Sequence, residues 1–195
     1  METVKIKING IEVETPKGST ILEAAHSAGI KIPTLCYLKG INAIGACRMC
    51  LVEVKGARAL AAACVYPVNE GMEVFTNTPT LRKSRQTTLE LLLSNHRSDC
   101  LSCVRNTDCE LQNLCREYNV DMHRFASDRT EPEIEQSTPH LVRDNSKCIL
   151  CRRCVAVCKK NQHVGVINVS KRGYQTHVGS AFDMPLGETA CVNCG

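Results

Sequence analysis

The sequence predicts an α+β protein built from three small consecutive domains. Two short alternating runs around a turn, then one helix and further β runs, predict a sheet with a helix across it in the first part of the chain. A leucine-rich helix follows, and 14 cysteines are gathered in sets along the 195 residues. Aromatic residues make up only 4% of the chain and tryptophan is absent. We therefore expect a small core that metal–thiolate bonds help to hold together.

Residues 1–78 form the first predicted domain. Asn9-Gly10 lies between the runs VKIKI and IEVET and is a strong signal for a β-hairpin. The stretch 20–23, Thr-Ile-Leu-Glu, is a capping box that begins a helix, and Gly29 is placed to end it. The runs CLVEVKG, RALAAACVYPV and MEVFTN predict further strands. Hairpin, helix and strands in this order predict a β-grasp sheet.

Residues 79–139 form the second predicted domain, which is small and helical. Thr78 and Pro79 supply a cap and a first-turn proline for a helix that ends near His96. We expect a second short helix over residues 109–118. The leucines near one face of the first helix are Leu81, Leu89, Leu92 and Leu93. Residues 127–139 are polar and punctuated by proline, which predicts a linker.

Residues 140–195 form the third predicted domain. A helix is expected over residues 152–160, and the runs VGVINV and GYQTHV predict two short strands. The dense cysteines that begin at Cys148 lie in this domain, and the pair Cys191 and Cys194 closes it.

The compartment and the class of partner follow from what the chain lacks. The N-terminal stretch has no apolar run of a secretory signal, and no segment approaches the roughly 18 apolar residues of a membrane span. We therefore expect a cytoplasmic protein whose thiols stay reduced and bind metal. The formal charge is +4, but aromatic residues are not interleaved with the basic ones, which argues against nucleic acid as a partner.

The first cysteine set is Cys36, Cys47, Cys50 and Cys64. Gly45 is the first residue of GACRMC, and glycine lets the backbone approach a cofactor closely. Four thiolates at the edge of a β-grasp sheet suit a [2Fe–2S] cluster. A structural zinc site with four cysteines is the alternative.

The second set combines His96 with Cys100, Cys103 and Cys109. The three cysteines are one ligand short of four, and His96 stands three intervening residues before the first of them. A solvated histidine, favoured by the C-terminal end of a helix, is the alternative to a ligand. Replacement of a thiolate by imidazole removes a negative charge and raises the reduction potential of a cluster.

The third set begins with Cys148, Cys151, Cys154 and Cys158, spaced as in the run Cys-x₂-Cys-x₂-Cys-x₃-Cys of bacterial ferredoxins. The fourth cysteine of such a run binds the other cluster of a pair. We therefore expect one [4Fe–4S] cluster on the first three and a second on Cys158, Cys191 and Cys194.

Each of these two clusters would take its fourth ligand from beyond Gly195. The third domain is thus expected to be a truncated two-cluster bacterial-ferredoxin-like domain, and the chain a piece of a larger subunit. Cys115 remains outside the three sets and is expected to be a small buried hydrophobe.

Four motifs, in this order, make the chain resemble one family along nearly its whole length. They are GACRMCLVEV, LLLSNHRSDCLSC, CELQNL and KCILCRRCVAVCKK. The family is the N-terminal iron–sulfur region shared by [FeFe]-hydrogenase catalytic subunits, NAD-linked formate dehydrogenases and the large iron–sulfur subunit of complex I. The resemblance implies a β-grasp [2Fe–2S] domain, then a His-Cys₃ [4Fe–4S] domain with His96 as ligand, then the ferredoxin-like pair.

Within this group, the sequence is most similar to NAD(P)-linked, multi-subunit [FeFe]-hydrogenases. The stretch Val-Arg-Asn-Thr-Asp after Cys103 and the run DNSKCILCRRCVAVCKKNQHVGVI carry that similarity. It implies one [2Fe–2S] cluster, up to three [4Fe–4S] clusters and a catalytic H-cluster further along. The implied partners are a flavin-bearing NAD(P)H-oxidising subunit, a small thioredoxin-like [2Fe–2S] subunit and, in some members, ferredoxin.

The chain itself has no H-cluster motif and no dinucleotide fingerprint, so electron relay is its expected task. Five basic residues beside predicted ligands are candidates for raising cluster potentials: Arg48, Arg152, Arg153, Lys159 and Lys160. The alternatives are the corresponding region of a formate dehydrogenase or complex I subunit, and, in another class, a zinc-stapled docking module.

Overall fold

The computed structural model describes residues 2–125 and 134–195. They form two compact units. Unit 1 comprises Met1–Tyr37, Ala43–Leu89 and Thr107–Val120, and unit 2 comprises Leu38–Asn42, Glu90–Asn106 and Asp121–Gly195. The predicted linker falls partly on residues 127–133, which lie outside the described residues. The division into three domains stays a prediction.

Unit 1 begins with the predicted hairpin. Strands β1 (Thr3–Ile8) and β2 (Ile11–Pro16) are antiparallel, and Ile8 pairs with Ile11 across the turn. Asn9 and Gly10 have φ angles of 53° and 85°, as a two-residue type I′ turn requires. The hairpin prediction is confirmed.

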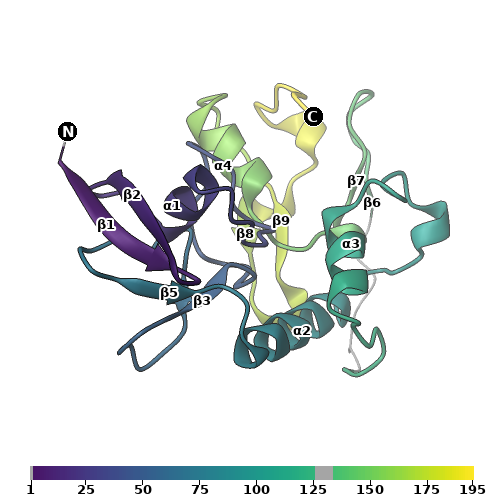
Figure 1. Ribbon diagram of the computed structural model, residues 1–195. Coiled ribbons are helices and arrows are strands. Elements are labelled where there is room, and N and C mark those ends of the chain that lie inside the picture. Colours follow the sequence, from purple (N-terminus) through teal and green to yellow (C-terminus); the bar gives the residue numbers. More distant parts are fainter. Residues whose placement is uncertain (1, 126–133) are drawn as a thin grey trace. The chain divides into compact units, whose positions relative to one another are not determined.

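Three further strands complete a mixed five-stranded sheet in unit 1 (Figure 1). They are β3 (Leu51–Val54), β4 (Ala61–Ala62) and β5 (Glu73–Phe75), and the strand order is β2-β1-β5-β3-β4. The central pair β1–β5 is parallel, and the other pairs are antiparallel.

Strand β4 is much shorter than the run RALAAACVYPV predicted. The chain turns directly after Ala62, whose carbonyl accepts hydrogen bonds from the amides of Val65 and Tyr66 at 3.0 and 3.1 Å. This turn contains Cys64, which is buried. The chain therefore leaves the sheet at a predicted cluster ligand.

Helix α1 (Ile21–Ser27) packs against the sheet and has the predicted capping box. The Thr20 hydroxyl accepts from the Glu23 amide at 3.2 Å, and the Glu23 carboxylate accepts from the Thr20 amide at 2.8 Å. The helix ends at Ser27, and Gly29, just after the C-cap residue Ala28, adopts the left-handed φ of 71°. The buried residues of the helix are Ile21, Leu22, Ala24 and Ala25.

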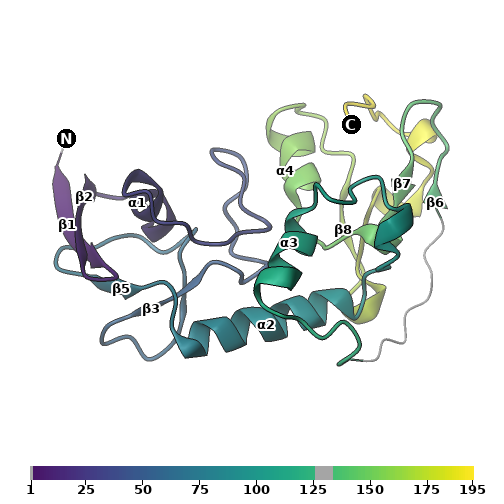
Figure 2. The same cartoon turned by 45° about the vertical axis from the view of Figure 1, so that its right-hand side comes forward.

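Helix α2 (Pro79–Leu93) is the predicted leucine-rich helix. Leu81 and Leu89 are completely buried, and Leu93 is nearly so. Helix α3 (Glu110–Glu117) is steeply inclined to α2 in Figure 2 and meets it at the C-terminal end of α3, where Tyr118 accepts a hydrogen bond from Arg85. Leu111 and Leu114 are the buried face of α3. Cys115 is only half-buried on α3, so the expectation of a buried residue there was wrong.

Unit 2 contains helix α4 (Arg153–Lys160), as predicted, and two short two-stranded sheets. Strand β6 (Ile134–Glu135) pairs with β7 (Arg143–Asp144), and β8 (Asn168–Ser170) pairs with β9 (His177–Gly179).

The run VGVINV was predicted as one strand, but only its end enters β8. The amides of Val164 and Gly165 instead donate to the Cys158 carbonyl at 3.1 and 3.2 Å and close the end of α4. The run GYQTHV likewise starts as a 3₁₀ turn and becomes a strand only at His177.

Among the residues that the structure describes, no helix is both long and apolar enough to cross a lipid bilayer.

Replacement of Thr20 by alanine should destabilise unit 1, because it removes the hydroxyl that satisfies the Glu23 amide. We expect the free energy of unfolding to fall by about 1 kcal/mol, measured by urea denaturation. Thr20→Ser keeps the acceptor and should remain close to the unsubstituted chain. Equal loss in both variants would contradict a capping role.

Candidate iron–sulfur sites

The first cysteine set lies together in unit 1, around the loop that leads into β3. Cys36, Cys47, Cys50 and Cys64 are each no more than 9% exposed. Arg48 has a left-handed φ of 57°, which turns the chain between Cys47 and Cys50. The structure therefore brings all four predicted residues into one buried region.

Contacts between sulfur atoms join these four residues. Hydrogen bonds from Cys47 and Cys64 lower the pKa of Cys36 to about 2. A hydrogen bond with Cys64 lowers the pKa of Cys50 to about 7. The pKa values of Cys47 and Cys64 are raised, chiefly because each shares a hydrogen bond with Cys36. The arrangement thus favours negative charge on Cys36 and Cys50, the state of sulfur that binds metal, and keeps protons on Cys47 and Cys64.

Main-chain amides also point at these sulfurs. Such amides stabilise anionic sulfur, and in iron–sulfur proteins they tune the reduction potential. The donors are the amides of Ala46 and Cys47 toward Cys36, of Met49 toward Cys47, and of Gly45 toward Cys64. Four buried thiols with this set of donors fit a four-cysteine cluster.

Gly45 is required by its backbone conformation. It has a φ of 61°, in the left-handed region that side chains disfavour. A β-carbon there would lie 3.4 Å from Val65 Cγ2, an ordinary contact. The conformation, and not lack of space, selects glycine at the position whose amide donates to Cys64.

The second set is divided between the two units. His96 follows α2, and its amide donates to the Leu93 carbonyl at 3.1 Å. Cys100 begins a 3₁₀ turn, and the Cys103 amide donates to the Cys100 carbonyl at 3.2 Å. Cys109 directly precedes α3 and belongs to unit 1. The binding of one cluster by these four residues stays a prediction.

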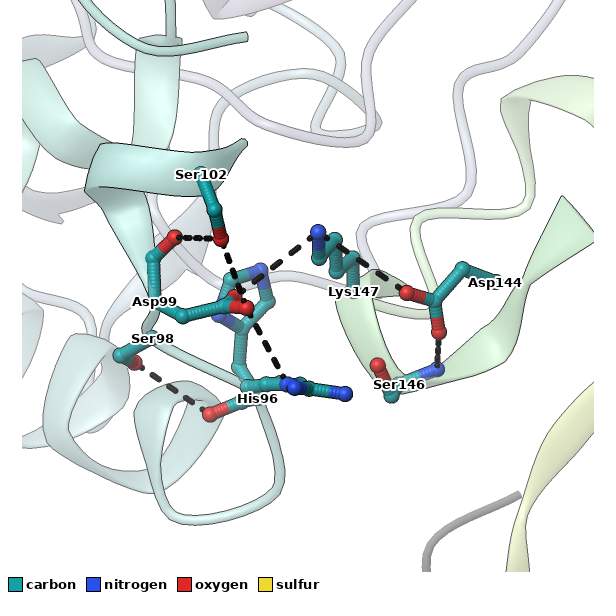
Figure 3. Close-up of polar contacts among 8 residues, drawn as sticks. His96, Ser98, Asp99, Ser102, Asp144, Ser146 and Lys147 are labelled. Carbon is teal, nitrogen blue, oxygen red and sulfur yellow. Dashed lines mark hydrogen bonds and ion pairs between the residues drawn. The ribbon is translucent and has the colours of Figure 1, made fainter. Parts of the chain in front are cut away.

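A charged network links the loop after His96 to the segment before Cys148, both in unit 2 (Figure 3). Asp99 forms an ion pair with Arg97 at 3.2 Å and approaches Lys147 at 3.8 Å. Lys147 also lies 3.9 Å from Asp144. In addition, the Arg97 amide donates to the Ser146 carbonyl at 2.9 Å. The spacing of the cysteines gave no sign of this connection.

Serine residues hold the two carboxylates of the network in their charged form. A hydrogen bond from the Ser102 hydroxyl is the main cause that lowers the pKa of Asp99. Ser146 has the same effect on Asp144, whose carboxylate accepts from the Ser146 amide at 2.8 Å. Lys147 therefore lies between two carboxylates that remain ionised.

The third set begins in a loop with unusual backbone angles. Leu150 and Arg152 have left-handed φ values of 54° and 59°, which curl the chain from Cys148 to Cys154. The Leu150 amide donates to Cys148 Sγ at 3.4 Å. A loop of alternating conformation that turns amides inward is typical of sites that hold anions.

Arg143 on β7 faces the start of this set. Burial raises the pKa of Cys148 and of Cys154, whereas the positive charge of Arg143 opposes the rise in both. Arg143 could not be predicted from the sequence, because it stands outside the cysteine motif and only the turn after β7 brings it near the thiols.

The basic residues that were selected beside the ligands are mostly in water. Arg48, Arg152, Lys159 and Lys160 are exposed, and Arg153 is half-buried. The Lys160 ammonium donates to the Ile41 carbonyl at 2.6 Å. Solvent screens exposed charges, so their effect on a cluster is smaller than that of a buried cation.

Cys158, Cys191 and Cys194 lie in unit 2 as three half-buried or exposed residues. Cys158 is in the second half of α4. The Cys191 amide donates to the Thr189 hydroxyl at 3.3 Å, and its thiol lies 4.0 Å from the Asn193 amide oxygen. Their association in one cluster stays a prediction.

Within residues 2–125 and 134–195, no group of three or more His, Cys, Asp or Glu side chains is arranged to hold a single metal ion. The contacts among the four cysteines of the first set are sulfur–sulfur and amide–sulfur hydrogen bonds.

Two parts of the chain match families of known proteins. Residues 1–79 match the family described as 2Fe-2S iron-sulfur cluster binding domain. Residues 85–124 match the NADH-ubiquinone oxidoreductase-G iron-sulfur binding region. A crystal structure of an NAD⁺-reducing [NiFe]-hydrogenase in the H₂-reduced state matches with a TM-score of 0.88 and 30% identity, over 96% of this chain and 80% of that one.

The chain belongs to the family of iron–sulfur regions found in NAD(P)-linked hydrogenases and in the G subunit of NADH-quinone oxidoreductase. This family contains [2Fe–2S] and [4Fe–4S] binding domains. The resemblance inferred from the sequence motifs is confirmed.

Two curated members of the family illustrate its range. The NADP-reducing hydrogenase subunit HndD of Solidesulfovibrio fructosivorans is 42% identical over all of this chain and 34% of its own length. The NADH-ubiquinone oxidoreductase 75 kDa subunit of Reclinomonas americana is 37% identical over 91% of this chain and 26% of its own length. The chain therefore spans about a third or less of these relatives.

Replacement of Lys147 by methionine should loosen the link between the loop after His96 and the segment before Cys148. With Lys147 removed, Asp99 and Asp144 repel each other, and the Arg97 amide should exchange its hydrogen a few-fold faster. Hydrogen exchange with mass spectrometry measures this. Lys171→Met removes the same charge elsewhere in unit 2 and should leave that amide unchanged.

Proposed function

We propose that this chain is the electron-relay region of an NAD(P)-linked [FeFe]-hydrogenase. The observation that carries the proposal is the buried set of four thiols with inward-pointing amides, in a chain that matches hydrogenase relatives along nearly its whole length. The region would pass single electrons between a nucleotide-oxidising partner and a catalytic H-cluster elsewhere in the same subunit.

The proposed cofactors are one [2Fe–2S] cluster and up to three [4Fe–4S] clusters. Such clusters supply one-electron redox chemistry. The first set would hold the [2Fe–2S] cluster, and His96, Cys100, Cys103 and Cys109 would hold a [4Fe–4S] cluster. Cys148, Cys151 and Cys154 would hold another, and Cys158, Cys191 and Cys194 a further one, each with a fourth ligand from elsewhere.

The proposed fold assignments follow the same order. Unit 1 is interpreted as a β-grasp domain with a helical addition, supported by the sheet order β2-β1-β5-β3-β4, its parallel central pair and α1 packed on the sheet. The left-handed loop followed by α4 supports a ferredoxin-like arrangement in unit 2.

The residues of the chain have three tasks in this proposal. Burial of the first set excludes water, which strengthens electrostatic interactions around the thiolates. The amides of Gly45, Ala46 and Met49 offset the negative charge of sulfur. The ion pairs of Asp99 and Lys147 hold the loops of the second and third sets together. None of these residues donates or accepts a proton in the relay.

The proposed partners are a flavin-bearing NAD(P)H-oxidising subunit and a small thioredoxin-like [2Fe–2S] subunit, with ferredoxin as a further donor or acceptor in the cytoplasm. The family resemblance supports these partners, and the name of the 42% identical relative supports NADP.

The choice of an [FeFe] enzyme is supported by the similarity of the run DNSKCILCRRCVAVCKKNQHVGVI to that branch. One structural neighbour is a [NiFe]-hydrogenase, so under this proposal the region would serve more than one kind of catalytic metal. The match of residues 85–124 favours a second candidate, a relay in a complex I-like oxidoreductase.

Cys64→Ser tests the proposal through the [2Fe–2S] site. The reconstituted chain should lose roughly two iron atoms and the corresponding paramagnetic signal of the reduced cluster. In the assembled enzyme, H₂-driven reduction of NAD(P)⁺ should be abolished. Cys115→Ala is the matched control in the same unit and should keep iron content and activity. A colourless chain that binds zinc and no sulfide would contradict the relay.

His96→Cys tests the second set. The added thiolate places one more negative charge on the cluster, so its midpoint potential should fall by on the order of 100 mV. A redox titration followed by electron paramagnetic resonance measures this shift. An unchanged potential with full iron content would show that His96 is not a ligand.

A further inference from the structure

Arg85 on α2 is the largest fully buried side chain of the described residues, with 1% of its surface exposed. A buried guanidinium is expensive, because it cannot lose its proton and water no longer solvates it. Proteins normally place a carboxylate beside such a group. The groups around Arg85 therefore decide whether its positive charge is balanced.

Every hydrogen-bond partner of this guanidinium among the described residues is electrically neutral. Its nitrogen atoms donate to the carbonyls of Met49, Leu51 and Thr76 at 3.1, 2.8 and 2.9 Å. A fourth bond reaches the Tyr118 hydroxyl at 3.1 Å. In the described part of the chain, no Asp or Glu carboxylate forms an ion pair with Arg85. Its hydrogen bonds are satisfied, but its charge is not balanced.

Two of the three carbonyls flank Cys50, a member of the first cysteine set. Met49 precedes Cys50 and Leu51 follows it, so Arg85 binds the main chain on both sides of this residue. The Met49 carbonyl and the Cys50 amide belong to one trans peptide and point in opposite directions. Because the Met49 carbonyl is directed toward Arg85, the Cys50 amide points away from α2, on the side opposite to the guanidinium.

We infer that Arg85 is a positioning residue for the [2Fe–2S] site and that its buried positive charge is balanced by the negative charge of the cluster. This inference rests on the proposed assignment of Cys36, Cys47, Cys50 and Cys64 as cluster ligands. Four thiolates around a [2Fe–2S] core leave a net negative charge, and the uptake of one electron adds another. A fixed cation nearby favours the reduced form, so Arg85 raises the reduction potential.

The inference distinguishes Arg85 from the other cations near the site. Arg48 is closer to the ligands in sequence but is exposed, and solvent screens its charge. Arg82 lies one turn before Arg85 on α2 and stacks on the same Tyr118 ring at 5.6 Å, but it is also exposed. Arg82 is therefore the matched control for a charge on the same helix.

The test compares Arg85→Met, Arg85→Lys and Arg82→Met in the full chain, reconstituted with iron and sulfide. The first readout is the midpoint potential of the [2Fe–2S] signal. We expect a negative shift in R85M, little or no shift in R85K, which keeps the charge, and none in R82M. The second readout is the rise in melting temperature that accompanies cluster loading. It should be smaller in R85M than in the unsubstituted chain, because only the latter gains the attraction between cation and cluster.

The outcomes separate the inference from the proposed function. If the unsubstituted chain has the [2Fe–2S] signal and R85M has the same potential, the inference is overturned and the ligand assignment survives. If the unsubstituted chain has no such signal, both are overturned. If R85M does not fold, R85K decides: an unshifted potential supports the inference, whereas a negative shift overturns it, since the charge is still present.

Discussion

The burial of negatively charged sulfur is the constraint on which unit 1 depends. Four thiols lie in a region with almost no access to water, and the low pKa of Cys36 shows that the surroundings favour a thiolate there. Burial alone would raise the pKa of a thiol and favour its neutral form. The compensation comes first from hydrogen bonds with the thiols of Cys47 and Cys64, and then from amides of the loop that contains the left-handed residues Gly45 and Arg48. The sheet and helices around the site position these groups.

In unit 2, the cysteines have different surroundings from those in unit 1. Its cysteines are less buried, and its loop relies on the left-handed residues Leu150 and Arg152 and on the charge of Arg143. Ion pairs around Asp99 and Lys147 join two predicted ligand segments that are far apart in the sequence. Cohesion here comes from polar links near the sites, since this unit contributes few of the fully buried apolar residues.

The sequence predicted correctly those elements that depend on interactions between neighbouring residues. The Asn9-Gly10 turn and the Thr20 capping box each depend on neighbours within four residues, and both were found. The lengths of the strands predicted at RALAAACVYPV and VGVINV were overestimated. The β propensity of these runs does not reveal that Ala62 closes a turn or that Val164 caps α4. Spacing grouped Cys36, Cys47, Cys50 and Cys64, which lie in one buried region, whereas the grouping of the other cysteines stays a prediction. Arg85 and Lys147 could not be found in this way, because their roles depend on contacts across 34 and 48 residues of sequence.

The partners of Arg85 bear on how this protein can diverge. Three of them are main-chain carbonyl oxygens, which every amino acid possesses. Side chains at positions 49, 51 and 76 can therefore change in evolution without removing an acceptor, while a change at position 85 removes all the donors at once. An alignment of relatives would then show one invariant arginine with no co-varying neighbour, and a search for correlated substitutions would pass over it.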